Sequence, residues 1–150
     1  MTTAIHRLVD RCRAGEHPAI VARLRSGWAV LGDRQVFAGY CLLLPDPVVH
    51  HLNALEIDAR ATFLDDMARL GDALIAATGA TRINYAMFGN AEPALHAHLF
   101  PRFDSEPASS RALQPWAFDW NAAPAFSEAA HGEIRRRLRA HLERGSTSPA

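Results

Sequence analysis

Two histidines separated by a single residue form a group that could do chemistry. They are His96 and His98, in the segment Pro93-Ala94-Leu95-His96-Ala97-His98-Leu99-Phe100-Pro101-Arg102. In a β-strand alternate side chains share a face, so the two imidazoles would point the same way, roughly 7 Å apart. One imidazole could attack phosphorus and form a phosphoramidate, which splits a difficult displacement into two easier steps. The other could protonate the leaving group near pH 7.

The same pair has two other interpretations. The imidazoles could bind a metal ion, but a third ligand would then be needed, and His50 and His51 are the other central histidines. The spacing taken alone is equally compatible with a pair of structural histidines in the core or at the surface. The surrounding sequence must therefore decide between catalysis, metal binding and packing.

The charge balance excludes several classes of function. The 150 residues include 16 basic and 16 acidic ones, and every basic residue is an arginine. A neutral chain lacks the basic excess that a nucleic-acid binder needs, so we expect no nucleic-acid partner. Without lysine, the chain can use neither the lysine of a P-loop nor Schiff-base chemistry.

The cysteines and the apolar runs bear on the compartment. Cys12 and Cys41 are far apart and imply neither a disulfide framework nor a zinc knuckle. Residues 1–13 mix charged with apolar side chains and lack the continuous apolar stretch of a signal peptide. The apolar run 37–44 is far shorter than the roughly 20 residues of a membrane helix. We expect a cytoplasmic protein of one domain, 1–150, with no membrane partner.

Hydrophobic periodicity predicts the elements that must position the two histidines. The helices are expected at 4–13, 57–78 and 127–144, and the strands at 19–24, 28–31, 39–44, 82–88 and 95–103. The order and the short connections predict an α+β fold, with an antiparallel sheet of about five strands and the helices on one side. Residues 104–126 read as an irregular arm that packs against the domain, and residues 145–150 are expected to fray.

Several arginines and tryptophans have alternative roles. Arg102 could bind phosphate or form a salt bridge at the end of its strand. Trp116 and Trp120, in the arm, could line a nucleobase pocket or act as packing anchors. The arginines at 135–137 and 139 are expected on a solvated face of the last helix.

At two stretches the sequence resembles the histidine-triad (HIT) family of nucleotide hydrolases and transferases. The first contains Cys12, Gly15-Glu16, Pro18-Ala19, Val21, Asp33, Gly39-Tyr40 and Leu43-Leu44-Pro45, against the family pattern C…GE.PA..V…D…GH.L..P. The second runs from Gly89-Asn90 to Pro101-Arg102, against GQ..PH.H.H..PR. The resemblance covers about 12–103 and implies the HIT-like fold, with the expected helix 57–78 as the family's long helix.

The resemblance implies a role for four residues. His96 matches the histidine that takes the nucleotidyl group, and His98 matches one that contacts the phosphate. Asn90 matches a polar residue that hydrogen-bonds the phosphate or the leaving group. Asp33 stands where a family acid meets the ribose hydroxyls, although the residue type is also typical of a hairpin turn.

Three positions depart from the family pattern. Ala94 replaces the first histidine of the triad, Val48 a histidine after the third strand, and Tyr40 the histidine of the Gly-His pair. His50 and His51 either compensate for Val48 or lie in a solvated loop. Because a supporting shell normally fixes the tautomer and aim of such a histidine, the departures leave two functions open.

The first function is hydrolysis or nucleotidyl transfer at a phosphoanhydride or phosphoramidate bond, through a nucleotidyl intermediate on His96. Dinucleoside polyphosphates such as diadenosine tetraphosphate are the substrates implied by the branch that the chain resembles. The second function is nucleotide binding without turnover. The resemblance further implies a homodimer, no redox cofactor and no catalytic metal.

Overall fold

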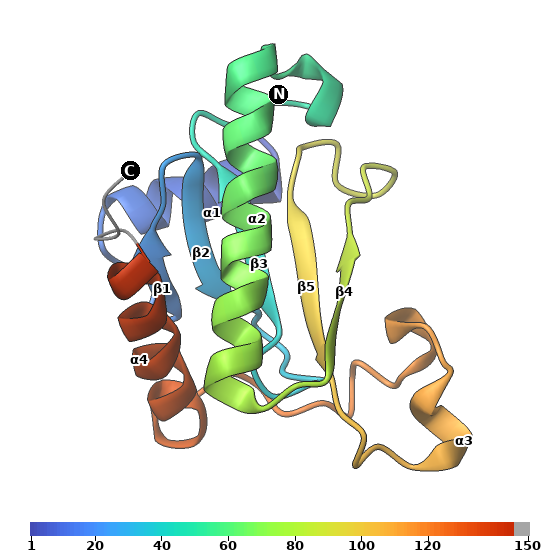
Figure 1. The fold of residues 1–150 in the computed structure, drawn as a ribbon. Coiled ribbons are helices and arrows are strands. Elements are labelled where there is room, and N and C mark those ends of the chain that lie inside the picture. The colour runs from blue at the N-terminus through green and yellow to red at the C-terminus, as the bar shows by residue number, and fades with distance from the viewer. Residues whose placement is uncertain (146–150) are drawn as a thin grey trace.

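A computed structural model of the chain describes residues 1–145 (Figure 1). Its elements are α1 (Ala4–Arg13), β1 (Ile20–Arg23), β2 (Gly27–Leu31), β3 (Cys41–Pro45), η1 (Leu52–Ala54), α2 (Ile57–Thr78), β4 (Arg82–Ala86), β5 (Ala97–Arg102), α3 (Ala108–Arg111), η2 (Pro115–Ala117) and α4 (Glu128–Gly145). The strands form a five-stranded sheet in the order β1-β2-β3-β5-β4, and every pairing is antiparallel. The predicted α+β class is therefore confirmed. Of the residues expected to fray, Gly145 is the last residue of α4, and residues 146–150 lie outside the described residues.

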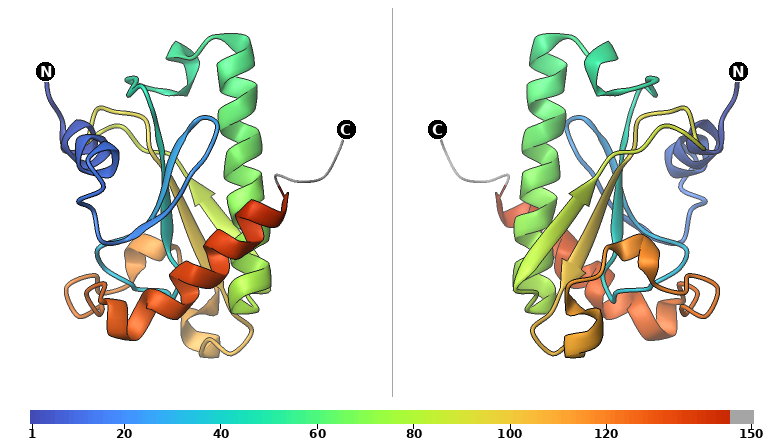
Figure 2. Two further views of the ribbon diagram at one scale, coloured as in Figure 1. Left: turned by 90° about the vertical axis from the view of Figure 1, so that its left-hand side faces the viewer. Right: turned by 90° about the vertical axis from the view of Figure 1, so that its right-hand side faces the viewer.

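The expectation that the helices lie on one side of the sheet is wrong. Helices α2 and α4 cover one face, whereas α1 lies on the other (Figure 2). Strand alternation explains this arrangement, because successive side chains of a strand point to opposite faces. In β2, Ala29 and Leu31 pack in the core under α2 and α4, while Val30 packs against Val9 of α1. Both faces of the central strands are therefore buried.

The last residue of helix α2 is Thr78, and Gly79 caps the helix in a left-handed conformation with φ of 74°.

The buried Asp66 of α2 fixes the helix to the β1–β2 turn, because it accepts a hydrogen bond from the Ser26 backbone N–H at 2.8 Å. Arg25 and Arg69 form ion pairs with the same carboxylate at 3.2 and 3.3 Å. The carboxylate is thus paired and hydrogen-bonded, as a buried charge must be.

The two edges of the sheet differ. At the β1 edge, Arg139 of α4 donates from Nε to the Val21 carbonyl oxygen at 2.7 Å and from Nη2 to that of Ile20 at 3.1 Å. Arg135 also reaches the Ile20 carbonyl. These two arginines of the basic run are therefore engaged with a strand, contrary to the expected solvated face, and they occupy acceptors that another chain could otherwise use.

Strand β4 forms the opposite edge of the sheet. Tyr85 on the strand and Met87 and Phe88 just after it are large, exposed apolar side chains. Phe88 contacts Trp116 of the arm edge-on, with ring centroids 4.8 Å apart. The β4 edge thus carries apolar surface where the β1 edge carries arginines.

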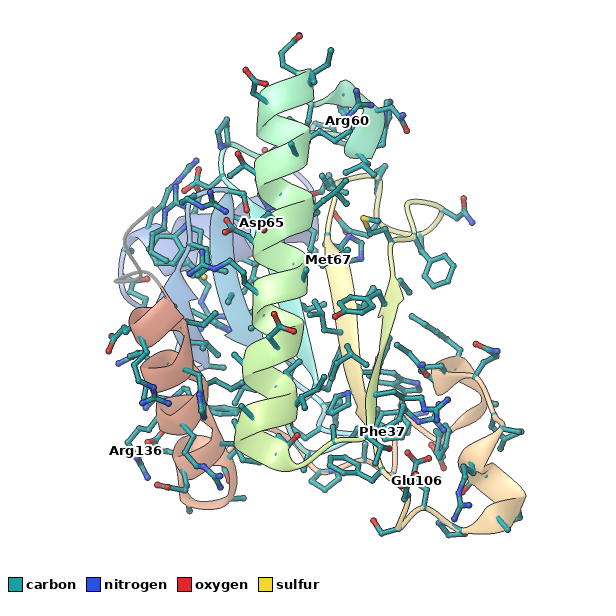
Figure 3. The ribbon with its side chains drawn as sticks, viewed as in Figure 1. Phe37, Arg60, Asp65, Met67, Glu106 and Arg136 are labelled. Carbon is teal, nitrogen blue, oxygen red and sulfur yellow. The ribbon has the colours of Figure 1, made fainter. Side chains whose placement is uncertain are left out.

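Arg102, at the end of β5, fastens the arm to the sheet. It is 6% exposed and pairs with Glu106 through Nη2 and Oε2 at 2.7 Å. It also donates to Asn84 Oδ1 at 3.0 Å and to the Leu113 carbonyl at 2.9 Å. Its guanidinium lies 4.9 Å from the Phe37 ring centroid, and Figure 3 shows Phe37 and Glu106 near this end of β5. Of the two predicted roles, the structure supports the salt bridge.

Replacing Arg102 by Met should lower the free energy of unfolding by about 3 kcal/mol, because it leaves a carboxylate and several carbonyls without their buried donor. Urea denaturation measures this change. Arg82→Met is the matched control, since Arg82 is the exposed partner directly opposite in β4, and its change should stay within about 0.5 kcal/mol. Equal losses in the two variants would contradict the role given to Arg102.

Candidate functional site

His96 and His98 come together on the face of the sheet that α1 partly covers. His98 lies in β5 and His96 immediately precedes it. Their ring centroids are 4.8 Å apart at an angle of 69°, closer than the strand rise alone predicts. Glu92, four residues before His96, accepts hydrogen bonds from the Ala4 and Ile5 backbone N–H groups at 3.3 and 3.4 Å. The loop before the histidines is thus tied to the N-terminus of α1, where a carboxylate is favoured.

The backbone sets the proton position on His96. Its Nδ1 lies 2.8 Å from the carbonyl oxygen of Ala94. A carbonyl oxygen can only accept, so Nδ1 must carry the hydrogen. In neutral His96 the second nitrogen, Nε2, therefore has a free lone pair. The residue is buried, at 8% exposure, so the geometry provides an oriented imidazole with one nucleophilic nitrogen.

His98 is held by Tyr40. Its Nδ1 lies 2.7 Å from the Tyr40 hydroxyl oxygen. Burial, together with the nearby His96, lowers the pKa of His98 to about 4, so His98 is neutral at pH 7. Burial also raises the pKa of Tyr40, whose hydroxyl therefore keeps its proton. A neutral His98 is suited to donating or accepting a hydrogen bond rather than acting as a strong acid.

Stacked aromatic rings fix Tyr40 and His98 in place. The Tyr40, His98 and Phe100 rings are nearly parallel, with Tyr40 4.7 Å from Phe100 at 3° and His98 5.7 Å from Phe100 at 6°. Gly32 makes room for this arrangement, because a Cβ there would lie 2.2 Å from the Tyr40 ring. The sequence had identified Tyr40 only as a departure from the family pattern. Tyr40 directly precedes β3, whose first residue, Cys41, pairs with Leu99 in β5. This position next to β5 is the signal that could have assigned Tyr40 a role.

The arm closes over these rings. Trp116 contacts His98 edge-on, with centroids 5.3 Å apart, and Trp120 contacts Tyr40 in the same way at 5.3 Å. The prediction that the arm packs against the domain agrees with these contacts. Edge-to-face contacts of this kind add stability beyond the area that they bury.

A pocket of about 250 Å³ lies beside His98. Its lining comes from α1, the loop after it, β2, the loop after β2, β3 and the arm: Leu8, His17, Val30, Leu31, Gly32, Asp33, Arg34, Tyr40, Leu42 and Trp120. Leu42 is the partner of His98 in the β3–β5 register, which places the pocket next to the histidine pair. A larger cavity of about 500 Å³ lies beside Arg102 and β4. No histidine lines that cavity, and Arg102 is already engaged, so the smaller pocket is the better candidate.

The other residues named in the sequence analysis differ in where they lie relative to the pocket and the two histidines. Asp33 lines the pocket and its side chain is exposed. Asn90 is exposed in the β4–β5 loop and is not part of the group. His50, also exposed, has Nδ1 3.4 Å from the Pro93 carbonyl oxygen, and His51 is exposed before η1. Within residues 1–145, no three His, Cys, Asp or Glu residues are placed to hold a metal ion.

The burial of the two cysteines determines whether they can act as nucleophiles. Cys12 and Cys41 are both buried free thiols, and burial raises the pKa of Cys12 to about 11. Neither cysteine is therefore a reactive thiolate at neutral pH.

In the part of the chain from 1 to 145, no helix has the length and apolar character to cross a membrane.

The fold is that of histidine triad proteins of known structure. A histidine triad protein from Marinobacter aquaeolei superimposes with a TM-score of 0.73 and 18% identity, over 96% of this chain and 98% of the other. A hypothetical histidine triad nucleotide-binding protein from Sulfolobus tokodaii gives 0.72 and 14%, over 92% of each chain. A Hit-like protein from Bartonella henselae, crystallised with an unknown ligand, gives 0.70 and 15%, over 94% and 99%. No family model matches the sequence, and no curated protein is similar to it.

Acidification should destabilise the protein through His98. Its pKa of about 4 in the folded state lies below the ordinary 6.5. Between these pH values His98 therefore binds a proton in the unfolded chain but not in the folded chain. The stability that neutral His98 provides is complete above pH 6.5 and is lost as the pH falls toward 4. In His98→Gln the melting temperature should therefore vary less over this range. If the melting temperatures of wild type and His98→Gln fell equally over this pH range, a buried, neutral His98 would be excluded.

Proposed function

We propose that the protein is a hydrolase or nucleotidyl transferase that cleaves a phosphoanhydride or phosphoramidate bond in a nucleotide. The observation that carries this proposal is the hydrogen bond from His96 Nδ1 to the Ala94 carbonyl oxygen, at 2.8 Å. In the neutral imidazole this hydrogen bond leaves Nε2 with the lone pair that attack requires. Dinucleoside polyphosphates, with diadenosine tetraphosphate as the reference compound, are the proposed substrate class.

The reaction takes two displacements at one phosphorus atom. His96 Nε2 attacks the phosphorus attached to the nucleoside, a P–N bond forms, and the bond from phosphorus to the leaving oxygen or nitrogen breaks. The leaving group departs with the electron pair of that bond and takes a proton from the solvent. Water then attacks the same phosphorus and gives up a proton. The P–N bond breaks, and the nucleoside monophosphate and free His96 result.

The neighbouring residues serve binding rather than bond breaking. When His98 Nδ1 accepts a hydrogen bond from the Tyr40 hydroxyl, its Nε2–H can donate to a phosphoryl oxygen, the role that the low pKa of His98 favours. Asp33 lines the pocket and would accept hydrogen bonds from ribose hydroxyls. Asn90, on its exposed loop, would contact the phosphate or the leaving group once substrate is bound.

Nucleotide binding without turnover is the second candidate. Ala94, where the resemblance expects a histidine, is 1% exposed and packs with Val9 and Leu44 beneath α1. Its side chain offers no polar group to the reaction. Only its backbone carbonyl contacts His96. In this second candidate that contact is not sufficient for catalysis.

Turnover of diadenosine tetraphosphate and adenosine phosphoramidate decides between the two candidates. His96→Ala should abolish hydrolysis of both compounds, a loss of at least about 10⁴-fold, because the nucleophile is gone. His51→Ala, which removes an exposed histidine before η1, should keep the wild-type rate. A wild type that binds adenosine monophosphate without turnover would favour the second candidate. Unchanged turnover in His96→Ala would refute the assignment of the nucleophile.

The proposal includes a homodimer joined at β4. One sheet edge is occupied by Arg135 and Arg139, whereas the other presents Tyr85, Met87 and Phe88 as exposed apolar side chains. Exposed apolar surface beside an unpaired strand favours association with a second copy. Continuous pairing of two sheets across this edge is therefore the proposed assembly.

Light scattering should give a mass twice that of the 16.5 kDa chain. Tyr85→Lys should shift the protein toward the monomer, because a charged side chain at an open edge disfavours strand pairing. Arg136→Lys, on α4 at the far side of the sheet, is the control and should leave the mass unchanged. A monomeric wild type at micromolar concentration would refute the homodimer.

A further inference from the structure

Gln35 is a buried side chain of the β2–β3 loop, with 3% exposure, whose amide bonds three times to the backbone of that loop. Its Nε2 donates to the carbonyl oxygens of Gly32 at 2.8 Å and Tyr40 at 3.0 Å. Its Oε1 accepts from the Gly39 backbone N–H at 2.9 Å. Because carbonyl oxygens only accept and N–H groups only donate, these partners fix the orientation of the amide. One side chain therefore joins the two ends of the loop.

The end of the loop that Gln35 holds is Tyr40, which contacts His98. The Tyr40 carbonyl oxygen also accepts from the Gly32 backbone N–H at 2.9 Å. A Cβ at position 32 would lie 2.2 Å from the Tyr40 ring, so the ring has no spare room on that side. Because Gln35 bonds the carbonyl oxygens of both residues, it holds the backbone of Gly32 against Tyr40. The direction of the Tyr40 ring depends on this close approach.

The arm holds the same loop from the outside. The Gln35 backbone N–H donates to the Pro124 carbonyl oxygen at 2.8 Å, and the Phe126 N–H donates to that of Asp33 at 2.8 Å. The main chain at Gln35 is therefore fixed by the arm, whereas its side chain is fixed to Tyr40. A shift of Tyr40 would break the bonds of the amide, because the loop backbone is not free to follow.

The hydroxyl of Tyr40 determines which nitrogen of His98 carries the hydrogen. Tyr40 is 5% exposed, and within residues 1–145 the hydrogen-bond partner of its hydroxyl is His98 Nδ1, at 2.7 Å. A buried hydroxyl that keeps its proton needs an acceptor for it. When the hydroxyl donates to Nδ1, neutral His98 carries its hydrogen on Nε2. This is the nitrogen that the proposed reaction uses to donate to a phosphoryl oxygen.

We propose that Gln35 is a positioning residue that holds Tyr40 in place and thereby keeps the hydrogen of His98 on Nε2. The inference rests on the proposed function, because it is that function which requires an Nε2–H donor. Gln35 itself touches neither imidazole and acts only through Tyr40. Without its amide, the Tyr40 hydroxyl is no longer held against Nδ1, and a larger share of His98 carries the hydrogen on Nδ1.

Nitrogen-15 NMR of the histidine side chains at pH 7 tests the proposal, because it shows which ring nitrogen carries the hydrogen. Gln35→Met keeps the length of the side chain and removes its donors and its acceptor. It should shift the ratio of the two His98 tautomers about fivefold toward the Nδ1–H form, equivalent to one lost hydrogen bond. Tyr40→Phe should shift the ratio in the same direction. In the Tyr40→Phe background, Gln35→Met should cause no further shift.

His131→Leu is the control for loss of stability alone. His131 is a buried residue of α4, and its Nδ1 accepts a hydrogen bond from the Ser127 backbone N–H at 3.1 Å. This variant should melt at a lower temperature and keep the wild-type tautomer ratio of His98. If Gln35→Met does not fold, Gln35→Asn serves as the second variant. Its amide is one methylene shorter, so the tautomer ratio should lie between those of wild type and Tyr40→Phe.

Turnover of diadenosine tetraphosphate separates this proposal from the proposed function. Gln35→Met should lower kcat about 10-fold at unchanged KM, because the phosphoryl oxygen loses a directed donor. A shifted tautomer ratio in a protein whose wild type has no turnover would uphold the role of Gln35 and refute the proposed reaction.

Two results would overturn the role of Gln35. The first is a wild-type tautomer ratio in the folded Gln35 variants. The second is an equal shift on adding Gln35→Met to wild type and to Tyr40→Phe, because Gln35 would then not act through Tyr40.

Discussion

Strand β5 must satisfy two different environments at once, and the arrangement of the rest of the molecule follows from that. Ala97 and Leu99 are fully buried in the core beneath α2 and α4. The alternate residues His96, His98 and Phe100 point to the opposite face, where polar rings need both cover and hydrogen-bond partners. Helix α1, Tyr40 and the arm provide that cover. A shift of one residue in the β5 register would place both imidazoles in the apolar core, so packing on the α2 side fixes the site on the other.

The sequence was sufficient for helices α1, α2 and α4, for the five strands and for the histidine pair, because these depend on local periodicity. The short helices α3, η1 and η2 were not predicted. The sequence was not sufficient for the side of the sheet that α1 takes, since an amphipathic helix has an apolar face whichever layer it packs on. The role of Tyr40 was missed for a related reason. Its hydroxyl contacts His98, which lies 58 residues further along the chain. That contact cannot be read from the residues near Tyr40 in the sequence.

Ala94 shows that a position can act through its backbone. The carbonyl oxygen at 94 orients His96 whatever side chain the residue carries. An alanine there also fills the space beneath α1, which is anchored by the contact of Glu92 with its first turn. His98 is supported by an aromatic stack and a phenol hydroxyl. A backbone carbonyl, a phenol and stacked rings thus hold the pair of imidazoles.

The unequal edges of the sheet also limit how far the chain can assemble. In the proposed homodimer, pairing along β4 would use the open edge of each copy. The edge left outward would be β1, whose Ile20 and Val21 carbonyl oxygens already accept hydrogen bonds from Arg139. Pairing of this kind is closed by a two-fold axis and cannot propagate. In the proposed dimer, Arg135 and Arg139 of α4 would keep the β1 edge from pairing with a further chain, so the sheet would end after its second copy.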